Sequence, residues 1–421
     1  MRILMLSPYI PWPPHGGGAI RIYNVLKQLR RRGHQIFLLA GQEGLARPVG
    51  PEVKAVCDEV HLFDLPSMSR AGLYLRSLFS LRPYPALKFR SAQLARQSTA
   101  LSEGRPFDLV WINFEVVADS LPPGIFKNTV AVLEEHESQE MVWRTHLEHG
   151  NLGQRFFAWS NLVKLRRFQE RILAHVTAVL SVSDVEAKLM RRRVPRGVEV
   201  WTVPNGVDVE FFRPTPFSLK ESNRIILTGN MSVRRNAEAA ARFARYIFPR
   251  VRSILPDAQF WIVGASPARE VLRLKNEAGV QVTGTVEDVR EHFAKARVCV
   301  SPYRYGAGTK LKVLEAMASG VPVVSTVEGC RGLDVKDGEH LVMAKNESDF
   351  SQGVVELLQN PQRAQRLATA ARKLAEDKYR WETIIDDLEP KLDELVRQRS
   401  TSARLDGSRA TLEPTARTQK D

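Results

Sequence analysis

The segment over residues 305–324 combines glycines and basic residues in an order suited to binding an anion. Gly308 and Thr309 stand directly before a predicted helix, and glycines allow the backbone to approach a ligand closely. The first turn of a helix presents unpaired N–H groups and the positive end of the helix dipole, which together attract phosphate. Lys310 and Lys312 lie in that turn, where their charges oppose the dipole unless an anion lies there. We therefore predict a phosphate site at the start of this helix.

Glu315 lies about one turn further into the same predicted helix. A carboxylate can accept two hydrogen bonds from neighbouring hydroxyl groups, as recognition of a ribose requires. The alternative is an exposed helix in which Lys312 and Glu315, three residues apart, form an ion pair. The residues of this segment allow both interpretations.

Two further candidates follow predicted strands. Arg235 comes after a predicted strand over residues 224–228, and its guanidinium can bind a phosphate through two hydrogen bonds. His136 follows a predicted strand over residues 130–134, and ligands of doubly wound sheets bind at strand ends. Flanked by two glutamates, its imidazole could be protonated beside a leaving phosphate, or neutral and a donor to a sugar. The alternative for both residues is an ordinary solvated side chain.

The composition limits the class of protein. The chain has 421 residues, 43% of them hydrophobic, which suffices for two domains with buried cores. Its formal net charge of +14 favours anionic partners such as nucleotide phosphates, anionic lipid or nucleic acid. The three cysteines are widely separated and lack CxxC spacing, which argues against a disulfide framework and a zinc site and favours a cytoplasmic location. The short apolar run at the N-terminus is no signal peptide, and no stretch is long enough to span a membrane.

Predicted strands and helices alternate along the chain, which implies parallel sheets with both faces covered. The pattern starts with a strand over residues 3–6 and a Pro- and Gly-rich loop, and it restarts at Arg224. We predict an α/β protein of two doubly wound, Rossmann-like domains facing across a cleft. Its parts are a first domain (1–207), a hinge (208–223), a second domain (224–374), helices that return to the first domain (375–397) and a disordered tail (398–421).

One basic segment, over residues 69–99, interleaves cations with aromatic and aliphatic residues. Such a composition is typical of a segment that lies at a membrane surface, where it would contact anionic lipid. A pair of core-packing helices with a solvated basic face is the alternative. Nucleic-acid binding is not expected, because no recognised module accompanies the charge.

In order and spacing these motifs resemble the retaining, GT-B-fold glycosyltransferases of the "glycosyl transferases group 1" family, of the polysaccharide-biosynthesis type. The resemblance starts at the Gly16-Gly17-Gly18 loop, passes through residues 181–184 and 204–208, and ends beyond the block at residues 315–324. It covers nearly all of residues 1–390. It implies that the first domain is the acceptor side and that the second binds a nucleotide sugar.

Individual residues follow from this resemblance. Glu315 matches the family's ribose-binding glutamate, whereas Ala307 stands where the family has another motif glutamate. Arg235 takes the place of a phosphate-binding lysine, and Asn230, next to Gly229, that of an arginine.

The first domain contributes the remaining candidates, namely the loop glycines and a histidine that matches the family's active-site histidine. The predicted catalytic residues are thus His136, Arg235 and Lys310, and the predicted donor-binding residues are Gly17, Gly18, Gly229, Asn230, Gly308, Thr309, Lys312 and Glu315.

The resemblance implies a retaining transfer of a hexosyl-type unit from a nucleotide diphosphate sugar to a glycan or lipid-linked acceptor, in bacterial surface or extracellular polysaccharide synthesis. The leaving phosphate itself would take the acceptor's proton, with no cofactor and no metal. Two alternatives remain open at this stage. One is a nucleotide-sugar epimerase on the same fold, and the other is a non-catalytic scaffold at the membrane.

Overall fold

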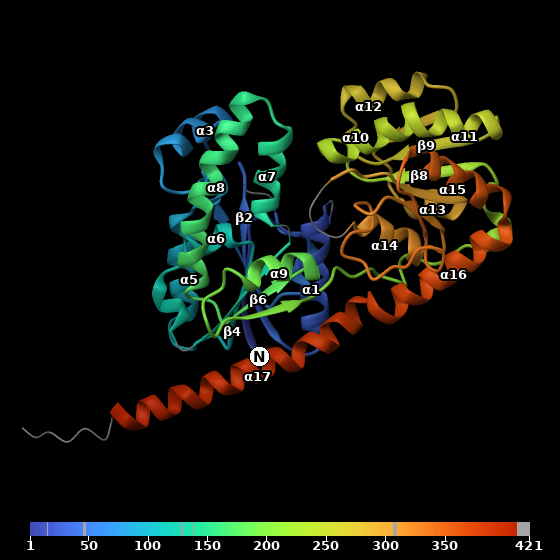
Figure 1. Cartoon of the computed structure of the whole chain (residues 1–421). Coiled ribbons are helices and arrows are strands. Elements are labelled where there is room, and N and C mark those ends of the chain that lie inside the picture. Colours follow the sequence, from blue (N-terminus) through green and yellow to red (C-terminus); the bar gives the residue numbers. More distant parts are fainter. Residues whose placement is uncertain (15, 45–47, 128, 137, 306–309, 411–421) are drawn as a thin grey trace, which may run out of the picture.

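The computed structural model describes residues 1–14, 16–44, 48–127, 129–136, 138–305 and 310–410. They form two α/β units, each built on its own parallel sheet and lying side by side (Figure 1). The predicted fold class, two doubly wound Rossmann-like domains, is confirmed.

The first sheet has seven strands in the order β3-β2-β1-β4-β5-β6-β7, all parallel. Its central strands are continuous apolar runs because helices cover both faces. In the first strand Ile3 and Met5 pack on the face covered by α1, whereas Leu4 and Leu6 pack on the opposite face. The strands are β1 (Arg2–Ser7), β2 (Gln35–Gln42), β3 (Glu59–Asp64), β4 (Leu109–Asn113), β5 (Val130–Glu135), β6 (Ala178–Ser181) and β7 (Glu199–Thr202).

The helices of the first unit lie in the connections between these parallel strands. The first of them starts at Gly17, within the run Gly16-Gly17-Gly18, and Gly33, with a φ of 80°, allows the turn that ends it. The helices are α1 (Gly17–Arg31), α2 (Pro51–Lys54), α3 (Arg70–Phe79), α4 (Tyr84–Lys88), α5 (Ala92–Ser102), α6 (Glu115–Ala118), η1 (Pro123–Phe126), α7 (Gln139–His149), α8 (Leu152–Leu173) and α9 (Asp184–Arg191).

The second sheet has six parallel strands in the order β10-β9-β8-β11-β12-β13. Separate apolar clusters fill its two faces, one beneath α10 and α15 and the other beneath α14 and α16. The strands are β8 (Arg224–Thr228), β9 (Gln259–Val263), β10 (Val280–Gly284), β11 (Val298–Ser301), β12 (Val323–Ser325) and β13 (Val342–Met343).

One helix of the second unit differs from the sequence prediction. The apolar spacing predicts a continuous helix over residues 237–254, but a π-helical turn, η3 (Phe243–Ile247), interrupts it. Pro249 follows within the first turn of the next helix, and a proline has no N–H for the α-helical ladder. The helices of this unit are η2 (Phe217–Leu219), α10 (Arg234–Arg242), α11 (Phe248–Ile254), α12 (Arg269–Arg273), η4 (Leu274–Asn276), α13 (Arg290–Lys295), α14 (Leu311–Ala318), α15 (Glu347–Gln359) and α16 (Pro361–Lys378).

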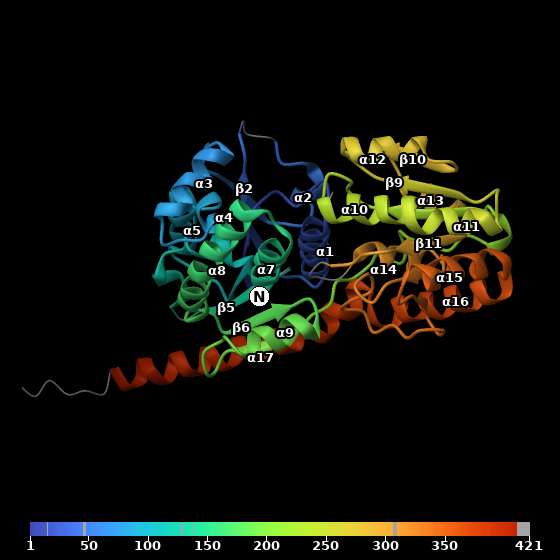
Figure 2. The same ribbon diagram turned by 45° about the horizontal axis from the view of Figure 1, so that its top comes forward.

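The last helix, α17 (Trp381–Ala410), leaves the second unit and runs along the first (Figures 1 and 2). Trp381, Ile385 and Leu388 join the apolar cluster that also contains the buried face of α1. The Trp381 ring lies under Gly206, where a Cβ atom would come within 2.5 Å of the ring. Since this helix is continuous to Ala410, the end predicted near Arg397 comes too early, and residues 411–421 lie outside the described residues.

None of the described helices is both long and apolar enough to cross a bilayer.

Candidate active site

Two glycines form the floor of the second unit's candidate site, at the carboxyl ends of β8 and β9. Gly229 has a φ of 146°, and a Cβ atom there would lie 2.7 Å from the Nζ atom of Lys312. A Cβ atom on Gly264 would come within 1.8 Å of the Gly229 carbonyl oxygen. Only glycines allow these two strand ends to lie so close together and so close to the lysine.

Lys312, in the first turn of α14, is held by side chains from two other segments. Its Nζ donates to Asn236 Oδ1 at 3.0 Å and to the Tyr303 hydroxyl, and it lies 4.9 Å from the centre of the Tyr303 ring. Burial lowers the pKa of Lys312 to about 8, with Arg235 lowering it and Glu315 raising it. The site thus holds a cation that a bound phosphate would stabilise.

Glu315 lies one turn further along α14 and is partly buried. Burial raises its pKa to about 7, and the nearby Lys312 offsets part of that rise. The hydrogen bonds of Lys312 go to Asn236 and Tyr303, which does not fit the alternative of an exposed ion pair between Lys312 and Glu315. Glu315 is placed where its oxygens could accept hydrogen bonds from a ligand.

Lys310 stands at the N-cap position of α14 and is 5% exposed, with its Nζ atom 5.6 Å from the centre of the Tyr303 ring. Both predicted lysines of this turn therefore lie around the same tyrosine. Gly308 and Thr309, which the sequence predicts to be part of the phosphate site, lie outside the described residues, as does Ala307.

Arg235 and Asn230 lie at the start of α10 and in the loop before it. The Asn230 side-chain oxygen accepts hydrogen bonds from the Ser232 backbone N–H at 2.9 Å and from its hydroxyl at 2.7 Å. Asn236 donates to the Asn230 carbonyl at 2.8 Å. In this arrangement Asn230 shapes the loop, and Arg234 and Arg235 at the start of α10 both line a cavity.

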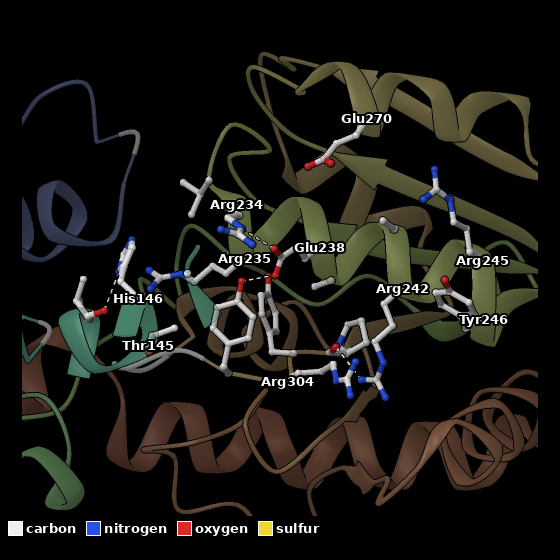
Figure 3. A pocket seen from close by; sticks show the side chains of 18 of the residues that line it. Thr145, His146, Arg234, Arg235, Glu238, Arg242, Arg245, Tyr246, Glu270 and Arg304 are labelled. Carbon is white, nitrogen blue, oxygen red and sulfur yellow. Dashed lines mark hydrogen bonds and ion pairs between the residues drawn. The ribbon is translucent and has the colours of Figure 1, made fainter. Parts of the chain in front are cut away.

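That cavity, of about 1160 Å³, lies between α7 of the first unit and α10 of the second. Figure 3 shows Arg235 extending across it toward His146. Tyr303 lines the cavity and also contacts Lys312, so the cavity and the lysine site adjoin. Typical small-molecule pockets measure roughly 300–1,000 Å³, so this space is large enough for a ligand of more than ordinary size.

His136 lies at the carboxyl end of β5 and stacks on Phe114, with the ring centres 4.2 Å apart. Its Nε2 lies 3.1 Å from Asn113 Oδ1 and 3.5 Å from Glu134 Oε2, both acceptors, so Nε2 carries a proton. Burial lowers the pKa of His136, although Glu134 raises it in part. The imidazole is therefore neutral near pH 7. Its Nδ1, which has no partner among the described residues, is an acceptor rather than a donor.

Phe114 adopts a φ of 67°, a conformation that non-glycine residues rarely take. It follows the end of β4 and holds its ring against His136. A strained residue of this kind persists where the surrounding structure enforces it, and such residues are found at ligand sites.

The loop glycines of the first unit approach both sides of the site. A Cβ atom on Gly18 would lie 2.1 Å from the Tyr9 hydroxyl and 3.3 Å from His136 Nδ1. A Cβ atom on Gly17 would lie 3.4 Å from a methyl group of Leu311, in α14 of the second unit. The start of α1 thus lies between His136 of one unit and the first turn of α14 in the other.

Glu134 and Arg21 form a buried network behind His136. Glu134 Oε1 accepts from Arg21 Nε at 2.8 Å, and Oε2 accepts from Trp111 Nε1 at 3.0 Å. Burial alone would raise the pKa of Glu134, but Arg21 and His136 outweigh it and the pKa falls to about 2. Arg21 also donates to the Pro204 carbonyl at 2.8 Å, so the network reaches the segment that connects the two units.

Two family descriptions match the two units of the chain. Residues 222–360 match the family described as "Glycosyl transferases group 1", and residues 15–211 match "Glycosyltransferase Family 4". The chain belongs to these GT-B glycosyltransferases. As a member of this family it uses a nucleotide sugar as donor, and the predicted family is confirmed.

The glycosyltransferase is similar in sequence to two named proteins. It is 22% identical over 391 residues to the "Uncharacterized 44.6 kDa protein in cps region" of Klebsiella pneumoniae, with 90% of this chain and 96% of that protein covered. It is 28% identical over 249 residues to a "GDP-mannose-dependent alpha-(1-6)-phosphatidylinositol monomannoside mannosyltransferase" of Mycolicibacterium smegmatis. That match covers 53% of this chain and 64% of the relative.

Solved structures share the fold of the glycosyltransferase. Sucrose-phosphate synthase from Thermosynechococcus elongatus superposes with a TM-score of 0.70 at 17% identity, covering 94% of this chain and 100% of that chain. Anabaena HepE in complex with UDP and glucose superposes with a TM-score of 0.64 at 16% identity, with the same coverage.

Several residues that shape the site were not predicted from the sequence. Asn113 and Glu134 orient His136, Arg21 holds Glu134, and Tyr303 holds both lysines. Asn113 and Glu134 stand at the ends of predicted strands, which is a signal that could have suggested them. Arg21 and Tyr303 carry no such signal, because their partners come from distant parts of the chain.

Proposed function

We propose that this glycosyltransferase transfers a hexosyl unit, with retention of anomeric configuration, from a nucleotide diphosphate sugar to a glycan or lipid-linked acceptor in bacterial surface polysaccharide synthesis. The observation that carries the proposal is the position of the neutral His136 and the glycine loop of one unit opposite Lys312 and Glu315 of the other. The work would take place at the inner face of the membrane. The name of the Klebsiella pneumoniae relative, a protein "in cps region", supports this pathway.

In this proposal the ribose and the diphosphate of the donor are bound by different parts of α14. Glu315 accepts hydrogen bonds from the ribose hydroxyls, because its pKa near 7 leaves it largely ionised above neutral pH. Lys312, Lys310 and the N-terminus of α14 face the diphosphate. The solved complexes of the structural neighbour HepE with UDP are consistent with a nucleoside diphosphate at this kind of site.

The chemical step follows from the charges. As the glycosidic bond breaks, negative charge grows on the leaving phosphate, and preorganised cations stabilise it. The phosphate then takes the proton of the acceptor hydroxyl on the face from which it leaves, which retains the configuration. His136 Nδ1 accepts a hydrogen bond from a sugar hydroxyl and so fixes the orientation of the sugar.

The test compares binding and turnover on two variants. Glu315→Ala should weaken nucleoside diphosphate affinity roughly ten- to hundredfold, because a lost hydrogen bond to a charged group costs about 1.5–3 kcal/mol. Arg235→Ala should reduce kcat more than affinity, because its charge acts mainly in the transition state. Nuclear magnetic resonance of the product should show a retained anomeric configuration. A Glu315→Ala protein that is folded and binds UDP and GDP like the parent would refute the donor-site assignment.

A second measurement separates the transferase from the other activities. Purified protein with a UDP- or GDP-sugar and an acceptor extract should give a glycosylated acceptor. Interconversion of sugars without any acceptor would identify an epimerase, and neither donor hydrolysis nor transfer would identify a non-catalytic protein.

A further inference from the structure

Two helices of the first unit expose an unusual set of large apolar side chains. They are α3 with the residues just after it, and the first half of α8, which Figure 1 shows next to each other. Tyr74 of α3 stacks on Phe157 of α8 with ring centres 3.8 Å apart, and Lys164 donates to the Ser77 carbonyl at 2.5 Å. The exposed members are Tyr74, Leu75, Leu78, Phe79, Leu81, Leu152, Phe156, Trp159 and Val163, and we call them the α3–α8 patch.

The side chains of the α3–α8 patch are too exposed to be core. Phe79 is 86% exposed and Leu152 is 84% exposed. On α8 the exposed residues recur at positions 152, 156, 159 and 163, which is the spacing of one helix face. Large contiguous apolar areas are rare on soluble proteins and mark surfaces that bind another molecule or a membrane.

Charge determines which occupant suits the α3–α8 patch. Residues 65–102 contain no Asp or Glu, and neither do residues 152–169. Exposed arginines flank the apolar side chains on both helices, namely Arg70, Arg76, Arg155 and Arg167. A second copy of the chain on this face would bring these like charges together, whereas anionic lipid would neutralise them.

The position of the patch adds a functional reason. α8 starts directly after the turn at Gly150, which lines the large cavity together with His146 of α7. The exposed Leu152 is therefore two residues from a residue that lines the cavity. A membrane in contact with the patch would lie near the α7 side of that cavity.

We propose that the α3–α8 patch docks the protein on an anionic membrane, with its aromatic side chains in the headgroup region and its arginines on lipid phosphates. Trp and Phe on one helix face with Arg beside them are typical of surfaces that bind in the membrane interface. Docking does not depend on the donor chemistry. Its use, which is to present a lipid-linked acceptor to the cavity, rests on the proposed function.

The experiment measures sedimentation of the full-length protein with vesicles of phosphatidylcholine, with and without phosphatidylglycerol. The parent should bind the anionic vesicles, and this binding should weaken with salt. The triple variant Phe79→Ser/Phe156→Ser/Trp159→Ser should bind these vesicles at least about tenfold more weakly than the parent. Burial of one large apolar side chain already contributes about a factor of ten to binding. Arg70→Gln, Arg76→Gln, Arg155→Gln should lose the preference for anionic lipid.

A matched control removes exposed apolar residues of the second unit, with Leu219→Ser, Ile254→Ser and Val327→Ser, and should bind vesicles like the parent. All variants should bind UDP or GDP like the parent, which separates loss of docking from loss of the donor site. The proposal is overturned if the parent does not bind anionic vesicles, or if the control variant loses as much binding as the patch variant. Sedimentation velocity without lipid that shows a dimer in the parent and a monomer in the patch variant would assign the patch to a second copy instead.

Discussion

The two sides of the candidate site treat charge in opposite ways. In the first unit Arg21 and Glu134 form an ion pair that is buried away from water. The neighbouring His136 is left uncharged. In the second unit Lys312 and Glu315 have pKa values of about 8 and about 7, so both can change protonation near neutral pH. One side is thus a preformed, rigid frame, whereas the other is poised to respond to a charged ligand. The difference suits a first unit that orients sugars and a second unit that holds a diphosphate.

The largest effect should come from breaking the buried Arg21–Glu134 ion pair of the first unit. Arg21→Met leaves the Glu134 carboxylate buried without its cation, which typically costs about 3–5 kcal/mol of unfolding free energy. Urea unfolding measures the loss. The matched control is Arg31→Met, whose partner Glu382 is exposed, and it should lose no more than about 1 kcal/mol. Equal losses in the two variants would contradict a special role for the buried pair.

The next effect concerns the charged side during turnover. Lys312→Met should lower kcat about 10²- to 10³-fold, because the transition state loses one preorganised cation. His136→Asn should lower it only about three- to tenfold, because a neutral hydrogen bond is worth about 0.5–1.5 kcal/mol. Steady-state rates on the two variants give the comparison. A larger loss for His136→Asn would mean that the histidine acts as a charged group or as a base.

A third prediction uses the pKa values of the second unit directly. At pH 8 the free Lys312 is about half protonated, so a bound diphosphate, which raises its pKa, should cause proton uptake. Near pH 7 Glu315 is about half protonated, so hydrogen bonds from a ribose, which lower its pKa, should cause proton release. The net proton change on UDP or GDP binding should therefore change sign between pH 7 and pH 8.

Calorimetry in buffers of different ionisation enthalpy measures this proton change. Lys312→Met should abolish the uptake and Glu315→Gln the release. If the parent shows neither, the nucleotide does not contact these two groups.

The smallest effect should separate two neighbouring glycines. Gly18→Ala forces the Tyr9 hydroxyl to move and brings a methyl group against His136, which should lower kcat/KM about tenfold, in the range of overpacked sites. Gly17→Ala meets only an ordinary contact with Leu311 and should stay within about twofold. If the two variants have the same kcat/KM, the close approach of α1 to His136 does not contribute to activity.

The second unit's half of the site could be predicted from the sequence because its residues are neighbours in the chain. Lys310, Lys312 and Glu315 lie within two turns of one helix, and a glycine-rich segment before that helix is readable by itself. The sheets were predictable for a similar reason, since buried parallel strands are continuous apolar runs. The residues around His136 in the first unit could not be predicted, because Arg21, Asn113 and Glu134 come from separate elements that meet only in the folded protein.

The outward face of α8 escaped prediction for a different physical reason. Its sequence carries apolar residues on both sides, with Phe157, Leu165 and Phe168 in the core and Phe156 and Trp159 exposed. Apolar spacing alone cannot show which of two apolar sides faces the core. Only the packing of α8 against its neighbours does so.

The crossing of α17 has a mechanical consequence. The chain passes between the two units twice, near residue 207 and near residue 380, and Val207 and Arg380 pair there in a short β-bridge, with Tyr379 accepting a 2.7 Å hydrogen bond from the Val207 N–H. Two chain connections that are hydrogen-bonded to each other act as a hinge. They allow the two units to rotate about the line through the connections, but they resist twisting and separation of the units. We therefore expect opening and closing about this line to be the easiest relative motion of the units, and it would bring the same residues of the two units opposite one another each time they close.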